Sequence, residues 1–500
     1  MTDNATPEVD AHDTRGLASN ALSRSPPMHS SRSLTEGSIS RKLLVFAMPI
    51  LVGNILQSLD GSVNSIWIGR FLGEAALTAS SNANTVLFLL LGALFGASMA
   101  ATILIGQYLG ARRSHDAKRV VGTSASFSIV VSLVMGALGW VICRPLLAAM
   151  STPAEALPLA VAYMRVIFCA LPFLVLYIFA TSVLRGAGDS KTPLYFLILN
   201  VVLDIGLNPL LIFGLGPVPR LGIAGSALAT LLAQGISLVL LIVHLYRRKD
   251  PLCLHGDELK LLRVDWSIVA TLITKGVPMA LQMIVVSLSM VLMITLVNRF
   301  GIDTTAAFGA ALQVWNYVQM PSFAIGMAVS SMVAQNIGAR KWDRVTSTAR
   351  LGVLYQLALT STLVVLIEIL NTRALGLFLP TGSAALGIAV HLNRIGAWSF
   401  VFFGISLVLF GVVRANGAVV APLIILLVTL LGVRFPLALT LLDRWQADAI
   451  WWSFPISSLL AVLLAMAYYK FGGWREARMM AMTPPEGSGA PVAQEHIGAG

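Results

Sequence analysis

The sequence has few charged residues and few cysteines. Only 11% of its 500 residues are Asp, Glu, Lys or Arg, whereas 57% are hydrophobic. That balance excludes a soluble globular domain and is typical of proteins that cross a membrane several times. The three cysteines, Cys143, Cys169 and Cys253, show no Cys-x-x-Cys spacing. We therefore expect neither a disulfide framework nor a zinc site.

Common catalytic motifs are also missing. The seven histidines show no His-Glu-x-x-His or His-x-x-x-x-Asp spacing, and the chain contains no Gly-x-Ser-x-Gly motif and no P-loop. A membrane-embedded transferase is thus the least favoured function, and we expect no enzyme activity, no cofactor and no resident metal. The formal net charge is +11. Because the basic residues lie in short loops between apolar runs, they indicate membrane topology and not a nucleic-acid partner.

Twelve apolar runs are long enough to span a lipid bilayer. They cover about residues 42–69, 84–106, 120–143, 159–183, 193–214, 222–246, 268–297, 305–334, 349–371, 384–413, 418–441 and 451–470. Pro321 interrupts the eighth run, and Asn393 and Arg394 interrupt the tenth. The sequence therefore predicts an all-α polytopic membrane protein with twelve transmembrane helices.

Basic residues are distributed unequally between the loops on the two sides. The loops after even-numbered runs hold 16 Lys and Arg residues, and those after odd-numbered runs hold six. The positive-inside rule then predicts that both termini are cytoplasmic. Residues 1–40 and 476–500 are polar or rich in Pro and Gly, and we expect disordered tails there. The longest loop, 247–266, is predicted to be a linker with a short interfacial helix.

The two halves of the chain repeat each other. Residues 107–112, Gln-x-x-Gly-Ala-Arg, return at 335–340, and residues 185–193 return more loosely at 414–422. Pro49 and Pro278 lie 229 residues apart, as do Arg70 and Arg299. Six runs separate the copies, so both halves face the same way across the membrane. We predict two six-helix pseudo-symmetric lobes, 41–246 and 267–475, with a site between them as in transporters with parallel repeats.

From about residue 40 to 475 the chain resembles the multidrug and toxic compound extrusion (MATE) transporters. The resemblance rests on Pro49 with its following polar face, on the two repeated loops, and on residues 185–193, 208–214 and 222–230. It implies a monomeric, multi-pass protein of the bacterial inner membrane that exports cationic amphiphilic compounds in exchange for protons or sodium ions. Residues 277–293 contain no carboxylate, which resembles the family's proton-coupled bacterial branch.

Five polar residues in the first and fifth runs are the candidates for ion coupling. They are Asp60 and Asn64, and Asn200, Asp204 and Asn208. Spacings of four place each set on one helical face. An apolar interior favours the neutral form of a carboxylate, so such a group can take up and release a proton. Structural hydrogen bonding of Asp204 and packing roles for Asn200 and Asn208 are the alternatives, and sodium is an alternative ion.

The resemblance does not fix the coupling residues in detail. Counted from Pro49, the family's usual aspartate position falls on Asn64, and Asp60 is the nearest carboxylate. With residues 208–214 as the reference, Asp204 falls on a position where the family usually has asparagine. The carboxylate and amide chemistry is nevertheless retained.

Further polar and aromatic residues are candidates for a substrate cavity. They are Gln57, Thr230, Gln234, Gln282, Gln313, Trp315, Tyr317 and Met320. The last four lie close together and resemble a soft aromatic surface for a lipophilic cation. An aromatic belt at the membrane surface explains Trp315 and Tyr317 almost as well.

A flippase for a lipid-linked oligosaccharide is the main alternative function, because such proteins share this architecture but have basic cavities. The interior positions identified above are acidic or amide, which favours cationic substrates. Arg394 and Arg434 are the interior residues that favour the alternative.

Overall fold

The computed structural model describes residues 33–150, 152–214, 219–380 and 382–479. Within these ranges, eleven helices are long and apolar enough to cross a membrane. A twelfth span is a pair of helices, α12 (Ala384–Gly396) and α13 (Ser399–Arg414), that meet at a 42° bend. The predicted all-α polytopic fold is confirmed. The bend lies in the predicted tenth run, whereas the eighth run forms one continuous helix despite Pro321.

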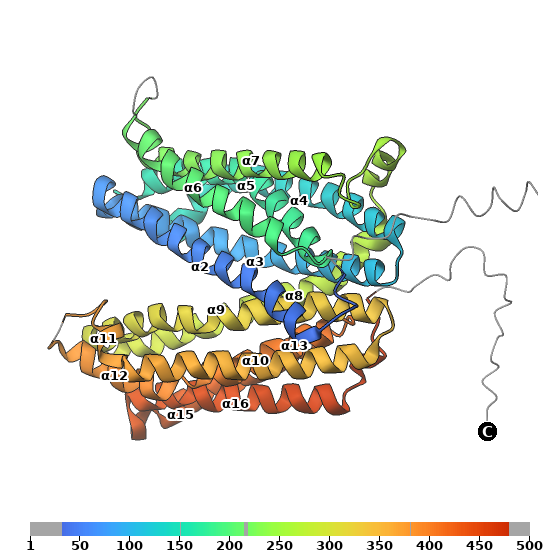
Figure 1. The fold of residues 1–500 in the computed structure, drawn as a ribbon. Coiled ribbons are helices and arrows are strands. Elements are labelled where there is room, and N and C mark those ends of the chain that lie inside the picture. Colours follow the sequence, from blue (N-terminus) through green and yellow to red (C-terminus); the bar gives the residue numbers. More distant parts are fainter. Residues whose placement is uncertain (1–32, 151, 215–218, 381, 480–500) are drawn as a thin grey trace, which may run out of the picture.

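The helices form two bundles that lie side by side (Figure 1). The amino-terminal lobe contains α2 (Ile39–Leu72), α3 (Glu74–Gly110), α4 (Ser114–Ala149), α5 (Leu157–Gly186), α6 (Lys191–Phe213) and α7 (Ile223–Arg247). The carboxy-terminal lobe contains α8 (Trp266–Val297), α9 (Ile302–Gly338), α10 (Trp342–Ile369), α11 (Asn371–Leu375), α12, α13, α14 (Val420–Leu426), the π-helix η3 (Leu427–Arg434), α15 (Phe435–Trp445) and α16 (Ala447–Phe471).

Equivalent turns separate the first two helices of each lobe. Gly73 follows α2 with φ of 86°, and Gly301 precedes α9 with φ of 90°. Only glycine adopts this backbone conformation readily. The same device therefore ends the first span and starts the second span in both halves of the chain.

The two lobes pack tightly against each other at one end, which we call the closed end and define by Gly110 and Gly338. A Cβ atom added to Gly110 would lie 1.9 Å from the Gln335 carbonyl oxygen, and one added to Gly338 would lie 1.9 Å from that of Gln107. The Gln107 amide donates to the Ala415 carbonyl at 2.7 Å. The Gln335 amide donates to the Gly186 carbonyl at 2.9 Å. The repeated loops thus form a reciprocal seal between the lobes.

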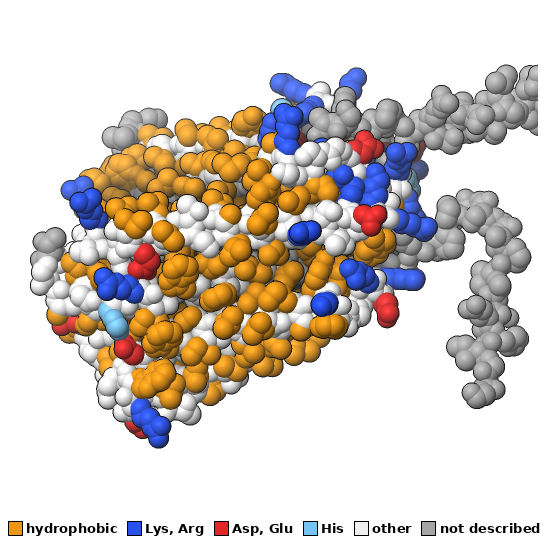
Figure 2. Space-filling model, turned by 60° about the horizontal axis from the view of Figure 1, so that its bottom comes forward, with side chains coloured by type: hydrophobic (Ala, Val, Ile, Leu, Met, Phe, Trp, Pro, Cys, Tyr) orange, Lys and Arg blue, Asp and Glu red, His pale blue; other side chains and the backbone are white. Residues whose placement is uncertain are grey.

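The lobes diverge towards the opposite, open end (Figure 1). At the closed end one buried apolar cluster includes residues from both lobes, such as Leu43, Ile105, Val333 and Val412. Towards the open end each lobe has its own cluster, centred on Phe168 in the first lobe and on Trp451 in the second. Figure 2 shows apolar side chains over the middle of one face and most Lys and Arg side chains at the closed end.

Part of the predicted amino-terminal tail, residues 33–40, is described by the structure. Most of residues 1–40 lie outside the described residues, but residues 33–40 are ordered against the closed end. Leu34 is buried, its amide donates to Gln335 Oε1 at 3.0 Å, and its carbonyl accepts from Asn336 Nδ2 at 3.3 Å. The disordered assignment is therefore wrong for this segment. At the other end, Met479 is also buried against the same cluster, and the rest of the predicted second tail, 480–500, lies outside the described residues.

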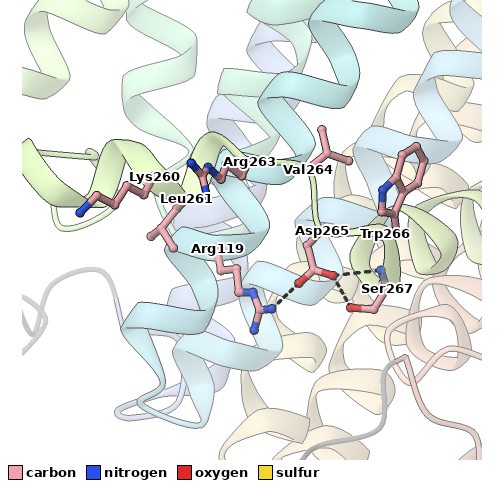
Figure 3. Close-up of a pocket in the computed structure, with 8 residues that line it drawn as sticks. All are labelled: Arg119, Lys260, Leu261, Arg263, Val264, Asp265, Trp266 and Ser267. Atoms are coloured by element: carbon pink, nitrogen blue, oxygen red, sulfur yellow. Dashed lines mark hydrogen bonds and ion pairs between the residues drawn. The ribbon is translucent and has the colours of Figure 1, made fainter.

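The linker between the lobes is held by ion pairs to α4. Its helical part, η1 (Gly256–Leu262), is a single 3₁₀ segment. Lys118 Nζ contacts Glu258 Oε1 at 2.6 Å, and Arg119 contacts Asp265 at 2.6 Å. Figure 3 shows the shallow cavity of about 520 Å³ that Arg119, Asp265 and neighbouring linker residues form. None of its lining residues borders the cavity between the lobes that is described below.

Candidate functional site

A polar cluster lies inside the amino-terminal lobe, where α2, α6 and α7 meet. Asn64 Nδ2 donates to Asp204 Oδ2 at 2.6 Å, and Thr230 Oγ1 donates to Asp204 Oδ1 at 3.1 Å. Asn208 Nδ2 donates to Asn64 Oδ1 at 2.6 Å. Asp204 and Asn208 are essentially inaccessible. The structure therefore brings together three of the candidates for ion coupling and Thr230, which the sequence had suggested for the substrate cavity.

Asp60 faces Asp204 across the same cluster, so two carboxyl groups are direct neighbours. Two carboxylates in an interior of low dielectric repel each other unless one holds a proton or a cation lies between them. Within the described part of the chain, Asp60 Oδ1, Asn200 Nδ2 and Gln234 Oε1 are buried without a hydrogen-bond partner. The cluster therefore has unused donors and acceptors around a carboxyl pair, which suits reversible proton or cation binding.

One member of this cluster was not anticipated from the sequence. Tyr163 of α5 is buried and lies close enough to Asp204 to interact with its charge. A tyrosine in an apolar run gives no sequence signal that separates packing from function. No three His, Cys, Asp or Glu side chains group as a metal site in the described residues. The oxygen atoms of the carboxyl pair, with neighbouring amide and hydroxyl oxygens, are of the kind that holds a sodium ion.

A separate central cavity of about 550 Å³ lies between the two lobes. Its wall is mainly apolar and includes four phenylalanines and five methionines. The lining residues are Asn54, Gln57, Ser58, Phe88, Phe95, Met99, Met279, Gln282, Met283, Val286, Asn316, Gln319, Met320, Ser322, Phe323, Gly326, Met327, Phe403, Leu407, Arg414 and Leu426. Gln57, Gln282 and Met320 were candidates from the sequence.

The remaining cavity candidates lie elsewhere. Trp315 is buried in the carboxy-terminal lobe, where its Nε1 donates to Asn393 Oδ1 at 2.8 Å. Gln313 and Tyr317 are exposed on other faces of α9 and do not line the cavity. The face of α9 that does so carries Asn316, Gln319, Met320, Phe323 and Met327, at helical spacing. The assignment of Gln313, Trp315 and Tyr317 to the cavity is therefore wrong.

Thr230 belongs to the polar cluster of the amino-terminal lobe, and neither Thr230 nor Gln234 lines the central cavity. Helix α2 forms the wall between these two sites. Asn54, Gln57 and Ser58 face the central cavity, whereas Asp60 and Asn64 face Asp204. A tilt or rotation of α2 would alter both sites at once.

The charged group in the cavity wall is an arginine that sequence reasoning had placed in a loop. Arg414, the last residue of α13, is the only charged residue among those that line the cavity. Arg434, in contrast, is buried away from it, where its guanidinium bonds Ser457 Oγ at 2.8 Å and lies over the Phe454 ring. Arg394 interacts with Glu368 and does not line the cavity either.

Comparison with known proteins agrees with this architecture. The MatE family matches residues 49–210 and, a second time, residues 278–440. The chain is 36% identical over 436 residues to the probable multidrug resistance protein YoeA of Bacillus subtilis (strain 168), covering 87% of this chain and 94% of YoeA. It is 32% identical over 450 residues to the probable multidrug resistance protein YpnP of the same organism, covering 89% and 98%.

The fold agrees as well. A crystal structure of MATE in complex with MaD3S superposes with a TM-score of 0.83 at 19% identity, covering 90% of this chain and all of that one. The two matched segments begin at Pro49 and Pro278, the residues from which the internal repeat was recognised. The protein is thus a transporter and not an enzyme, and the chain belongs to the MatE family of multidrug and toxic compound extrusion transporters.

Proposed function

We propose that the protein is a secondary active antiporter that exports amphiphilic organic compounds, lipophilic cations among them, in exchange for protons. The observation that carries the proposal is the Asp60–Asp204 carboxyl pair, which shares helix α2 with the wall of the central cavity. Two relatives named as probable multidrug resistance proteins support the drug-like nature of the substrate.

Coupling requires that the proton and the substrate favour different conformations, because a ligand with equal affinity for both states shifts nothing. A protonated Asp60 can donate to Asp204, whereas two ionised carboxylates separate or admit water. Protonation therefore draws α2 towards α6. Because the other face of α2 carries Asn54, Gln57 and Ser58, the same movement reshapes the central cavity.

The closed end is the cytoplasmic end in this proposal, because most Lys and Arg side chains gather there (Figure 2). Both termini are then cytoplasmic, and the open end of the protein faces outwards across a bacterial inner membrane. One proton that crosses 100 mV releases about 2.3 kcal/mol, enough for roughly fiftyfold accumulation of a neutral compound. A monovalent cation exchanged one for one needs the pH gradient instead.

The test uses the purified chain, acting as a monomer, in proteoliposomes with a fluorescent lipophilic cation. Dye movement against its own gradient should require an imposed pH gradient. Movement driven by a sodium gradient alone would replace the proton by sodium at the same carboxylates. Transport that needs ATP and responds to neither gradient would contradict the proposal.

The flippase alternative also has an observation in its favour, because Arg414 gives the central cavity a positive charge. The same vesicles test it. Translocation of a lipid-linked oligosaccharide, without gradient-driven movement of small amphiphiles, would favour the flippase.

A further inference from the structure

The wall of the central cavity combines three kinds of surface. Phenylalanine and methionine supply nine of its 21 lining residues, and such side chains adapt to flat lipophilic molecules. Asn54, Gln57, Asn316 and Gln319 add neutral hydrogen-bonding groups. Arg414 supplies the single full charge. A substrate that fills this space therefore meets a positive group and no negative one.

The Arg414 guanidinium is only partly used by the protein. Its Nε donates to the Phe410 carbonyl at 3.1 Å, and its Nη1 makes a long bond of 3.3 Å to Gln282 Oε1. Among the described residues, Nη2 has no hydrogen-bond partner and no Asp or Glu lies within 4.0 Å of the guanidinium. The two bonds fix the orientation of the group, and Arg414 is among the residues that line the cavity.

The acidic residues of the site do not compensate this charge. Asp204 is buried in the amino-terminal lobe and accepts hydrogen bonds from Asn64 and Thr230. Asp60 lies beside it, and neither residue lines the cavity. An uncompensated guanidinium in a mostly apolar space attracts anions more strongly than the same group in water.

We propose that Arg414 binds an acidic substituent of the substrate, a carboxylate or phosphate oxygen, while the lipophilic body lies against the phenylalanine and methionine wall. Preferred substrates are then amphiphilic zwitterions and acids, and a compound with only positive charge binds less tightly. The inference rests on the proposed function, because it takes the central cavity as the place where the substrate binds. It makes Arg414 a residue that determines specificity.

A matched pair of dyes tests the inference directly. Rhodamine 110 carries a free carboxylate, and rhodamine 123 is its methyl ester, so the aromatic body is the same. Equilibrium binding of both dyes to the purified protein in detergent is measured by fluorescence anisotropy without any ion gradient. Since a hydrogen bond to a charged group contributes about 1.5–3 kcal/mol, wild type should bind rhodamine 110 about tenfold to a hundredfold more tightly.

Variants assign the preference to the guanidinium. Arg414→Gln should remove the preference for rhodamine 110 and leave the affinity for rhodamine 123 equal or higher, whereas Arg414→Lys should retain part of it. Gln282→Glu places a carboxylate beside the intact guanidinium, and it should also remove the preference. Arg185→Gln is the matched control, because Arg185 is the repeat equivalent, bonds Ser182 and lies outside the cavity wall.

Two results would overturn the inference. One is a wild-type protein that binds the ester as tightly as the acid or more tightly. The other is an Arg414→Gln protein that binds both dyes with the wild-type ratio. Failure of the proposed function is a distinct result, because it would show as an absence of gradient-driven uptake in proteoliposomes while the ratio measured in detergent stays high.

Discussion

The two lobes descend from one repeated unit, yet their polar interiors differ. At the 229-residue offset of the repeat, Asp60 corresponds to Ser289 and Asp204 to Val433. Ser289 is buried and donates to the Leu430 carbonyl, so it holds α8 against the π-helix η3. The carboxyl pair thus exists in one lobe only. The equivalent arginines Arg185 and Arg414 differ in the opposite sense, because here the functional group is in the carboxy-terminal lobe. Arg185 bonds Ser182 within its own lobe, whereas Arg414 lines the central cavity.

The closed end shows the opposite behaviour, because there the two copies have stayed alike. Gln107 and Gln335 make equivalent bonds across the seam, and Gly110 and Gly338 make equivalent close approaches. Close packing against a two-fold partner constrains both copies equally, whereas an interior facing only its own lobe does not. We infer that the contacts at the closed end are retained because the movement of the lobes depends on them. The interiors of the two lobes can differ and serve different functions.

The largest effect should come from removing the buried carboxylate that only one lobe possesses. The asparagine side chain in Asp204→Asn is nearly the same size as aspartate but cannot ionise. Its NH₂ group would also face a donor, because Asn64 and Thr230 donate to the two carboxylate oxygens of Asp204. We expect pH-driven efflux in proteoliposomes to fall to background while the protein still folds and inserts. Ser289→Ala, the change at the corresponding position of Asp60 in the other lobe, is the control and should transport normally. Normal pH-driven efflux by Asp204→Asn would remove the functional difference between the lobes.

The carboxylate of Asp60 should still function when it is moved one helical turn along α2, to position 64. Asp60→Asn should also abolish pH-driven efflux, and adding Asn64→Asp should restore a substantial part of it. The reason is that Asn64 already contacts Asp204 at 2.6 Å, so a carboxyl there again forms a pair. Efflux is measured with the same dye and gradient for both variants. A double variant as inactive as Asp60→Asn alone would show that the position of the carboxylate matters, and not only its presence.

Equivalent substitutions in the two lobes at the closed end should reduce stability by similar amounts. Gly110→Ala and Gly338→Ala each place a Cβ 1.9 Å from a carbonyl oxygen of the other lobe. Overpacking of this kind costs about 1–3 kcal/mol, and thermal unfolding in detergent should show similar losses for both. Gly309→Ala, on α9, is the control because a Cβ there meets nothing within 4 Å. Clearly unequal losses would contradict the equivalence of the two copies.

Trp315 should matter for the stability of the carboxy-terminal lobe and not for substrate binding. Trp315→Phe removes the bond to Asn393 Oδ1, and a net loss of about 1 kcal/mol is expected because buried Asn393 loses its donor. Dye affinity should stay at the wild-type value. A lower dye affinity with unchanged stability would show that Trp315 contacts the substrate.

The smallest effect concerns the linker, which ion pairs attach to the amino-terminal lobe. Lys118 Nζ bonds both carboxylate oxygens of Glu258 at 2.6 and 2.7 Å and holds the pKa of Glu258 below its usual value of 4.5. When the pKa of a carboxyl group is lower in the folded than in the unfolded protein, the group stabilises the fold at pH values above its unfolded-state pKa. This contribution is lost as the pH falls through the folded-state pKa.

Lys118→Gln should therefore be less stable than wild type at neutral pH, by less than about 1 kcal/mol because the pair is partly exposed. The difference should vanish well below pH 4.5, the usual value for this group. Unfolding followed at several pH values measures it. A difference that persists in acid would mean that the contact acts through packing.

The spans and the polar cluster could be predicted from the sequence, but the orientation of helices around the cavity could not. Asp60, Asn64 and Asp204 stand out because a polar group within an apolar run is costly and needs a partner. Along α9, in contrast, lipid, core and cavity all accept apolar or aromatic side chains, so periodicity does not tell Trp315 from Met320. Trp315 is buried because α12, α13 and α16 pack on that face and bring Asn393, Phe400 and Phe454 beside it.

Arg414 was missed for a related reason. Counted along the chain, it lies where a run ends and a basic loop residue is expected on topological grounds. In three dimensions the end of α13 lies beside Gln282 of α8, so the same residue borders the central cavity. Whether a residue at the end of a helix borders a cavity depends on the packing of other helices, so it cannot be predicted from the residues of that helix alone.

The contact of Leu34 with the closed end has a consequence for the order of biosynthesis. Its amide bonds a side chain 301 residues further along the chain, and a ribosome adds about 5–20 residues per second. Leu34 therefore waits roughly 15–60 seconds for its partner to be made. By the end of that time all residues of the first lobe have been made, while its contacts with the second lobe at the closed end are still incomplete. The contacts of Leu34 and Gln107 across the closed end can therefore form only after much of the second lobe has been made, because their partners are Gln335 and Ala415.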